Sequence, residues 1–344
     1  MASPALRQPH AESQQQHEFR IPDTLACWPW QRAINPHYEI CKRESIEWLE
    51  SFHAFNPKAQ DAFNRCDFPG CRVGADLMNV FFVIDEYTDI ANGQETRQKA
   101  DIVMDSLRNP YKERPSGEWI GGRIVQEFWQ EATKTATEIA QRRFLDTFER
   151  YTDAVVQQSQ DRTSNYIRDI SSYFTIRRKT IGAEPSFVIN TIHTNVPDEL
   201  INHPTIERLA LLSIDMILIG NDLVSYNIEL RAPLQPISQS RGDEGHNLLT
   251  VVMQEHGLTL QEAFDWIGRL HNDLVSQFLK IYAEIPAFVS RCGILGPEVS
   301  SYVDALGNWV RANDSWSFES ERYFGMDGFR VQQEKTFLLL TKHS

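Results

Sequence analysis

The sequence predicts an all-α protein. Apolar residues recur at three- and four-residue spacing over long stretches, whereas runs that alternate between apolar and polar residues, as strands do, are scarce. Proline and glycine separate these stretches, and no segment of the chain repeats another. Apolar residues make up 41% of the 344 residues, which is enough for a substantial core. We expect a single domain over residues 18–344 with about ten or more helices.

The expected elements follow in chain order. Residues 1–17 are polar and should form a disordered leader, because they cannot bury enough apolar surface. The segment Cys66–Cys71 contains Pro-Gly and predicts a turn directly before an apolar helix. The clearest helical spacing then occurs in four stretches: Ile124–Thr152, Thr205–Asn227, Leu260–Ala283 and Glu298–Trp309.

The segment Leu230–Gly245 interrupts this helical pattern. Pro233 and Pro236 lack the amide hydrogen that a helix interior needs, at a cost of about 3 kcal/mol each. We therefore expect the preceding helix to end by about Ala232 and a further helix to begin near Asn247.

Charge and cysteine content exclude several classes of protein. The formal net charge is −13, whereas a protein that binds nucleic acid through its phosphates is usually basic. The five cysteines are odd in number and match no zinc or redox spacing, so we expect a reduced, cytoplasmic chain. The first residues lack the apolar run of a signal peptide, and no stretch of about 18 uncharged apolar residues predicts a stable membrane insertion.

The first motif with chemical potential is Asp85-Glu86-Tyr87-Thr88-Asp89, which follows an apolar helical face. Asp85 and Asp89 are four residues apart, so their carboxylates lie on the same side of a helix and repel each other unless a cation binds between them. Carboxylate oxygens are ligands that Mg²⁺ prefers. The alternative is a helix end with solvated acids, because a short acidic motif alone is a weak signal.

The second motif is a polar stripe on the helix predicted over Thr205–Asn227. Asn221, Ser225 and Glu229 recur every four residues and bring an amide oxygen, a hydroxyl and a carboxylate to one face. Three oxygen donors on successive turns can bind one cation. Asp222 is expected either behind these ligands or facing solvent. The alternative is an amphipathic helix end that Asn221 caps.

Together these two motifs resemble the class I terpene cyclases. The aspartate-rich motif of that family is similar to Asp85-Glu86-x-x-Asp89, and its second metal motif is similar to Asn221-Asp222-x-x-Ser225-x-x-x-Glu229. The segment Arg177–Gly182 looks like the one that carries the diphosphate-sensing arginine. That arginine lies four residues before a glycine in the family, which indicates Arg178. Arg322-Tyr323 looks like the C-terminal pair that contacts diphosphate.

The resemblance extends to the fungal, basidiomycete-type sesquiterpene synthases and covers nearly the whole chain from Phe19. The residues that carry it are Phe19–Asp23, Trp28–Trp30, Asn35–Tyr38, Gly117–Trp119 and Trp316–Glu319. The Asp-Glu-Tyr-Thr-Asp form of the first motif, with Asn109-Pro110 downstream, looks most like the subgroup that forms Δ6-protoilludene through 1,11-closure.

The resemblance implies a mechanism and its ligands. The substrate is farnesyl diphosphate, and the family uses three Mg²⁺ ions, two on the aspartate motif and one on Asn221, Ser225 and Glu229. Arg178 and Arg322 would donate paired hydrogen bonds to the diphosphate, and Tyr323 would add a hydroxyl donor. The carbocation that remains needs a dry aromatic pocket, for which Phe81, Trp316 and, ranked after them, Phe82 are the candidates. No obligate protein partner is implied.

Four alternatives stay open. A chain-elongating prenyltransferase would carry a second aspartate-rich motif in place of Asn221, Ser225 and Glu229, and a scaffold protein would explain neither motif. The product could instead arise by 1,10-closure. The segment Leu230–Ser238 separates Glu229 from a family-like Gln239–Asp243 segment, so the chain could also be an impaired cyclase. Arg231 or Arg241 would then have to serve as the basic residue that the family often has there.

Overall fold

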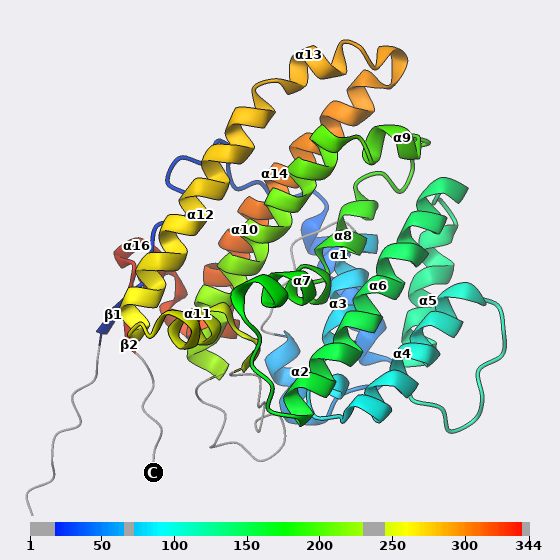
Figure 1. Ribbon diagram of the computed structural model, residues 1–344. Helices are drawn as coiled ribbons and strands as arrows, with labels where there is room; N and C mark the ends of the chain where they lie inside the picture. The colour runs from blue at the N-terminus through cyan, green and yellow to red at the C-terminus, as the bar shows by residue number, and fades with distance from the viewer. Residues whose placement is uncertain (1–17, 65–71, 230–244, 339–344) are drawn as a thin grey trace, which may run out of the picture.

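The computed structural model describes residues 18–64, 72–229 and 245–338, with the side chains of residues 62 and 227–229 outside the description. The described residues form sixteen α-helices, two short 3₁₀ helices and two strands (Figure 1). In chain order the elements are β1 (Glu18–Arg20), α1 (Tyr38–Glu50), α2 (Pro57–Asn64), α3 (Arg72–Thr88), α4 (Gly93–Arg108), α5 (Gly121–Thr133), α6 (Glu138–Thr163), α7 (Ile170–Thr180), α8 (Ala183–Ile189), α9 (Asp198–Ile201), α10 (Pro204–Glu229), α11 (Leu248–His256), α12 (Leu260–Tyr282), α13 (Ile285–Val289), η3 (Gly293–Leu295), α14 (Gly296–Glu319), α15 (Glu321–Phe324), η4 (Gly325–Asp327), α16 (Gly328–Glu334) and β2 (Thr336–Leu338).

The helices pack around two hydrophobic core clusters. One cluster is formed mainly by α10, α12 and α14, three long helices that lie side by side in Figure 1. The other is formed by α3, α4, α5 and α6, and its largest buried side chains include Trp129, Phe144 and Phe148. The all-α prediction is therefore confirmed, and the two clusters face each other across α3, α8 and α10.

Three of the four predicted helical stretches are single helices. Thr205–Asn227 and Leu260–Ala283 correspond closely to α10 and α12, and Glu298–Trp309 is the first part of the longer α14. Asn247 caps α11 with its side chain on the amide of Leu249, so a helix does resume at the predicted position. The segments Cys66–Cys71 and Leu230–Ser238, the proposed leader, Arg231 and Arg241 lie outside the described residues.

The fourth stretch of helical spacing, Ile124–Thr152, is divided between two helices. The chain turns between Thr133, the end of α5, and Glu138, the start of α6. Thr137 causes the break locally, since its hydroxyl accepts a hydrogen bond from the amide of Ala140 at 3.3 Å and caps α6. The apolar spacing on both sides of the turn remains in phase, and this hides the break in the sequence.

A two-stranded antiparallel sheet that the sequence did not predict joins the two ends of the described chain. Phe19 of β1 pairs with Phe337 of β2, and the amide of Ile21 donates to the carbonyl of Lys335 at 2.8 Å. Strands of three residues are too short to show an alternating pattern. The segment after β1 then crosses α14, where the Trp28 indole donates to the Gly307 carbonyl at 3.0 Å.

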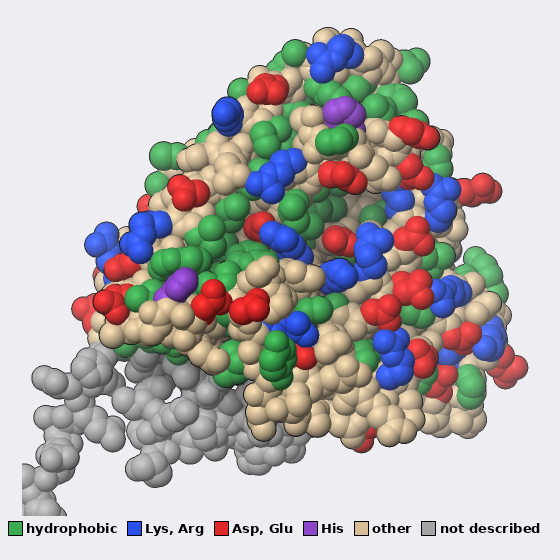
Figure 2. Space-filling view, viewed as in Figure 1, with side chains coloured by type: hydrophobic (Ala, Val, Ile, Leu, Met, Phe, Trp, Pro, Cys, Tyr) green, Lys and Arg blue, Asp and Glu red, His purple; other side chains and the backbone are tan. Residues whose placement is uncertain are grey.

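One described helix, α10, is long and apolar enough to cross a membrane over Pro204–Tyr226. However, 72% of its apolar window is buried inside the protein, where the helix packs against α12 and α14. Its hydropathy is therefore accounted for by its central place in the core. On the face of the molecule seen in Figure 2, acidic and basic side chains are interspersed, and no continuous basic surface of the kind that binds nucleic acid is visible.

Candidate active site

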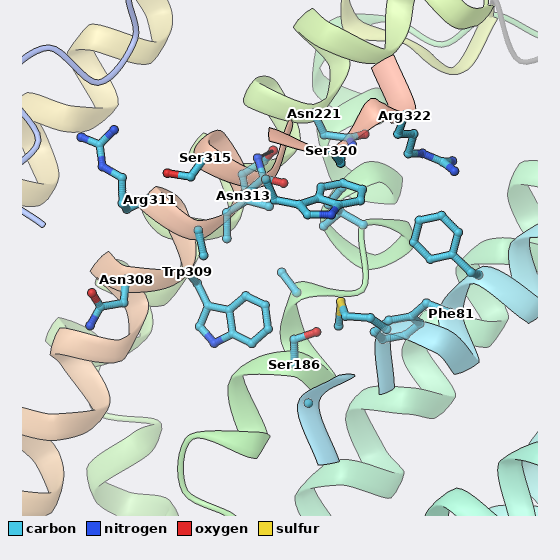
Figure 3. A pocket seen from close by; sticks show the side chains of 18 of the residues that line it. Phe81, Ser186, Asn221, Asn308, Trp309, Arg311, Asn313, Ser315, Ser320 and Arg322 are labelled. Atoms are coloured by element: carbon cyan, nitrogen blue, oxygen red, sulfur yellow. Dashed lines mark hydrogen bonds between the residues drawn. The ribbon is translucent and has the colours of Figure 1, made fainter. Parts of the chain in front are cut away.

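A cavity with a volume of about 910 Å³ is lined by residues of both core clusters. Its walls come from α3, α6, α8, α10 and α14, and the segment over residues 31–39 borders it as well. In Figure 3 the side chains of Phe81 and Trp309 extend toward the cavity from α3 and α14, and Ser186 of α8 lies between them. The volume is at the upper end of the range for small-molecule sites.

The first acidic motif lies at the end of α3 and faces this cavity. Asp85 is in the last turn of the helix and Asp89 directly follows it, with the Asp89 amide bonded to the Asp85 carbonyl at 2.9 Å. Both residues line the cavity, whereas Glu86 does not. The pKa of the Tyr151 phenol is raised well above 10, first by burial and then by the charges of Asp85 and Asp89. Tyr151 therefore faces the two carboxylates from α6.

The second motif lies on α10 and faces the same cavity. Asn221 and Ser225 line it, and the Asn221 amide donates to the Tyr323 hydroxyl at 2.9 Å. Asn247 lies 3.4 Å from the Ser225 hydroxyl. Glu229 is the last residue of α10, and its carboxylate is outside the described side chains. The structure thus brings Asp85, Asp89, Asn221 and Ser225 to one cavity.

Asp222 does not face solvent, which was one of the two expectations for it. The side chain is 1% exposed and accepts hydrogen bonds from the Tyr173 hydroxyl, from the Arg177 guanidinium at 3.0 Å and from the Leu248 amide at 3.1 Å. Burial raises the pKa of this carboxyl, and the charge of Arg177 opposes the rise. Asp222 therefore orients Arg177 from behind the motif.

The structure separates the two neighbouring arginines of α7. Arg177 lines the cavity, and its guanidinium donates to the Asn221 amide oxygen at 2.6 Å. Arg178 does not line the cavity. It forms a two-bond ion pair with buried Asp215 at 2.7 and 2.9 Å, and its side chain is 33% exposed. Of the two neighbouring arginines, the structure therefore places Arg177, and not the predicted Arg178, at the cavity.

The C-terminal candidates lie together at the cavity. Arg322, Tyr323 and Trp316 all line it, and the Trp316 ring packs edge-on against Tyr323 at 5.7 Å between centroids. The Arg322 guanidinium lies over the Phe82 ring at 4.5 Å from its centroid. Cation–π attraction therefore helps to hold the Arg322 guanidinium at the cavity wall.

Phe81 is held firmly in the cavity wall. Its ring stacks on Phe148 at 5.6 Å with an interplanar angle of 3°, and it packs edge-on against Tyr151 at 4.9 Å. Gly182, which has a φ of +71°, approaches the ring so closely that an added Cβ would lie 3.0 Å from it. Glycine is therefore favoured at this position for two reasons. It adopts the left-handed conformation of the turn before α8, and it leaves room for the Phe81 ring.

Several cavity residues were missed by the sequence analysis. These residues all line the cavity and include Arg177, Tyr151, Asn190, His246 and Trp309. Trp309 had a usable signal, since it precedes Trp316 by two helical turns on α14 and so shares its face. Its indole donates to the Asn190 amide oxygen at 3.1 Å. Asn190 and His246 carried no comparable signal, because isolated polar residues occur throughout the chain.

The oxygen donors suit a hard divalent cation. Two carboxylates on α3 and an amide and a hydroxyl on α10 face one cavity, and oxygen ligands of these types are those that Mg²⁺ binds. Within the described ranges no three His, Cys, Asp or Glu residues come together in a group that could hold a metal ion. The Asn221 oxygen accepts one hydrogen bond from Arg177, and an amide oxygen has a second lone pair.

Comparison with known proteins places this cavity in a family. The profile for terpene synthase family 2, C-terminal metal binding, matches residues 76–277. A Δ6-protoilludene synthase of Hypholoma sublateritium is 55% identical over 312 residues, covering 91% of this chain and 92% of the relative. A Δ6-protoilludene synthase of Stereum hirsutum is 50% identical over 333 residues, covering 93% and 87%.

A solved structure agrees on the fold. Linalool/nerolidol synthase from Streptomyces clavuligerus has a TM-score of 0.71 at 17% identity and covers 85% of this chain and 99% of that chain. The matched profile includes α3 from residue 76 onward and all of α10. This chain therefore belongs to the terpene synthase family, as a class I sesquiterpene cyclase that acts on a prenyl diphosphate and depends on a divalent metal ion.

Proposed function

We propose that this enzyme ionises farnesyl diphosphate with the help of three Mg²⁺ ions and cyclises the cation by 1,11-closure to Δ6-protoilludene, releasing diphosphate in the cytoplasm. The observation that carries the proposal is one cavity with oxygen ligands and arginines at one side and aromatic rings over the rest. The names of relatives that are 55% and 50% identical support the product.

The metal ligands in this proposal are Asp85, Asp89, Asn221, Ser225 and Glu229. Mg²⁺ bound to them would neutralise the charge that makes diphosphate a poor leaving group. We infer that Arg177 and Arg322 donate hydrogen bonds to the diphosphate oxygens, and that the Tyr323 hydroxyl does so from beside Asn221. Arginine suits this task since its guanidinium stays charged and offers a fixed fork of donors.

The aromatic side chains would then stabilise the carbocation. Phe81, Trp309 and Trp316 approach the cavity from α3 and α14, so a cation between them meets ring faces from two sides. Each such contact contributes about 2 kcal/mol when water is excluded. Rings that are fixed by stacking, as Phe81 is on Phe148, also restrict how the substrate chain folds before closure.

Product analysis tests the proposal. Purified enzyme is incubated with farnesyl diphosphate and Mg²⁺, and the extract is analysed by gas chromatography and mass spectrometry. We expect Δ6-protoilludene as the main product and none after chelation of the metal. A product set dominated by germacrenes or cadinenes would refute 1,11-closure and leave the cyclase assignment intact. Absence of any product with intact, folded protein would instead point to impairment by the segment Leu230–Ser238.

A further inference from the structure

The turn that follows the acidic motif is held by a buried polar cluster outside the cavity. Helix α3 ends at Thr88 and α4 begins at Gly93, so only four residues connect them. Thr88 and Ala91 are 4% and 6% exposed, and the last carbonyls of a helix have no partner within it. The Thr88 carbonyl accepts from the Ala91 amide at 3.2 Å within the turn, and the remaining acceptor capacity of the Thr88 and Ala91 carbonyls, on either side of Asp89, needs partners from elsewhere.

Two residues of α6 supply those partners. The Arg162 Nη2 atom donates to the Thr88 carbonyl at 2.7 Å and to the Ala91 carbonyl at 2.9 Å. The Ser159 hydroxyl donates to the same Ala91 carbonyl at 2.7 Å and itself accepts from the Thr96 hydroxyl of α4 at 3.0 Å. Helix α6 therefore binds the turn on both sides of Asp89, and α4 is tied into the same cluster.

The charge of Arg162 also acts at the cavity. Asp85 and Asp89 lie at the C-terminal end of α3, where the helix dipole is negative and disfavours carboxylates. The field of Arg162 reaches the cavity: the pKa of His246, which lines it, is lowered well below 6.5 by burial first and then by the charges of Arg177, Arg168 and Arg162. Arg162 itself is not among the cavity-lining residues.

We propose that Arg162 is a positioning residue that holds the turn after the acidic motif, so that Asp89 stays in the cavity wall with its carboxylate available to Mg²⁺. The inference rests on the proposed role of Asp85 and Asp89 as metal ligands. Arg162 acts through the backbone of Thr88 and Ala91 and touches neither metal nor substrate. Residues that orient metal ligands in this indirect way typically contribute about 10- to 100-fold in metal affinity or activity.

The test compares Arg162→Gln with a matched variant at the other end of α6. Arg143 is the control, since its guanidinium also donates to a backbone carbonyl, that of Val196 at 2.5 Å, and pairs with Asp198 at 2.6 Å. Mg²⁺ is titrated calorimetrically into each protein with inorganic pyrophosphate present, and the Tm of each is measured. The half-saturating Mg²⁺ concentration for turnover provides a second readout.

We expect Arg162→Gln to weaken Mg²⁺ binding by about tenfold. Arg162→Lys should weaken it less, because the lysine ammonium still donates to a carbonyl. Arg143→Gln should lower the Tm without changing Mg²⁺ binding. Equal Mg²⁺ affinity in Arg162→Gln and wild type, or an equal loss in Arg143→Gln, would overturn the proposal.

A milder variant covers the case in which Arg162→Gln does not fold. Ser159→Ala removes one donor to the Ala91 carbonyl and should weaken Mg²⁺ binding by about two- to threefold, whereas unchanged binding would count against the cluster. The calorimetry keeps the two proposals apart. If the wild type binds Mg²⁺ with pyrophosphate but forms no cyclic product, the proposed function fails while the positioning role remains measurable.

Discussion

Replacing Arg177 and Arg178 separately by lysine distinguishes a substrate contact from a structural ion pair. Both changes keep the positive charge and remove the fork of donors. Arg177 is 12% exposed, and two of its nitrogens lie within 3.1 Å of Asn221 and Asp222 at the cavity. Arg178 reaches Asp215 on the other side of α7.

The magnitude follows from the donors that lysine cannot replace. A single ammonium can satisfy one of the groups that the Arg177 fork contacts, so about two charge-assisted hydrogen bonds of about 1.5 kcal/mol are lost. If diphosphate receives those donors, the transition state loses about 3 kcal/mol of stabilisation, and kcat/KM falls roughly 150-fold. Arg178→Lys keeps the charge beside buried Asp215 but loses one of two charge-assisted hydrogen bonds, so it should cost about 1.5 kcal/mol of stability and change kcat/KM by less than about threefold.

Steady-state kinetics with farnesyl diphosphate and saturating Mg²⁺ measure the first effect, and thermal unfolding measures the second. Binding of inorganic pyrophosphate with Mg²⁺, followed by calorimetry, shows whether the Arg177→Lys defect concerns the anion. The reasoning is refuted if Arg178→Lys loses turnover while Arg177→Lys retains it, since the cavity-facing arginine would then not be the functional one.

Three further predictions concern the metal motifs, the segment after α10 and acid stability. Asp85→Asn, Asn221→Ala and Glu229→Gln should each reduce turnover by about 100-fold or more while far-UV circular dichroism stays unchanged; normal turnover in all three would exclude the oxygen-ligand assignment. Deleting residues 230–238 should improve Mg²⁺ affinity or turnover by joining Glu229 to Gln239, and unchanged values would show that the segment is harmless. Burial lowers the pKa of His271 on α12 from 6.5 to about 4, so between these pH values the unfolded state binds more protons than the folded state. The free energy of unfolding should therefore fall by about 3 kcal/mol in total as the pH drops from about 6.5 to 4. His271→Gln should flatten that part of the stability-versus-pH curve measured by denaturant unfolding, and an unchanged curve would assign the acid sensitivity to other groups.

The sequence predicted the helices that carry the motifs because periodicity and the motifs agree there. Thr205–Asn227 matches α10 within a few residues, since the apolar stripe that buries the helix runs directly into the polar stripe at Asn221. The break at Thr137 could not be read in the same way. A single capping hydroxyl decides it, and the apolar faces of α5 and α6 both point into the same core cluster.

The choice between Arg177 and Arg178 shows where motif reasoning ends. Counting four residues back from Gly182 fixes a position in the sequence, but the direction of a side chain depends on the rotation of α7 against α10. That rotation is set by buried partners on the other helix, Asp222 for Arg177 and Asp215 for Arg178. These two aspartates lie seven residues apart on α10, and nothing in their local sequence marks them as partners of α7.

The pairing of β1 with β2 has a consequence for the order in which the enzyme is made. The strand Glu18–Arg20 is synthesised before the sixteen described helices, and its partner Thr336–Leu338 is synthesised after them (Figure 1). During synthesis the first strand must therefore wait unpaired while the helices between them are completed. Arg322 and Tyr323 lie on α15, and only η4 and α16 separate this helix from β2. The pairing of β2 with β1 therefore holds the chain shortly after these two residues. Arg322 and Tyr323 thus join the cavity after the lining residues of α3, α6, α7 and α10 have been synthesised, so the cavity wall is incomplete until α15 has been made.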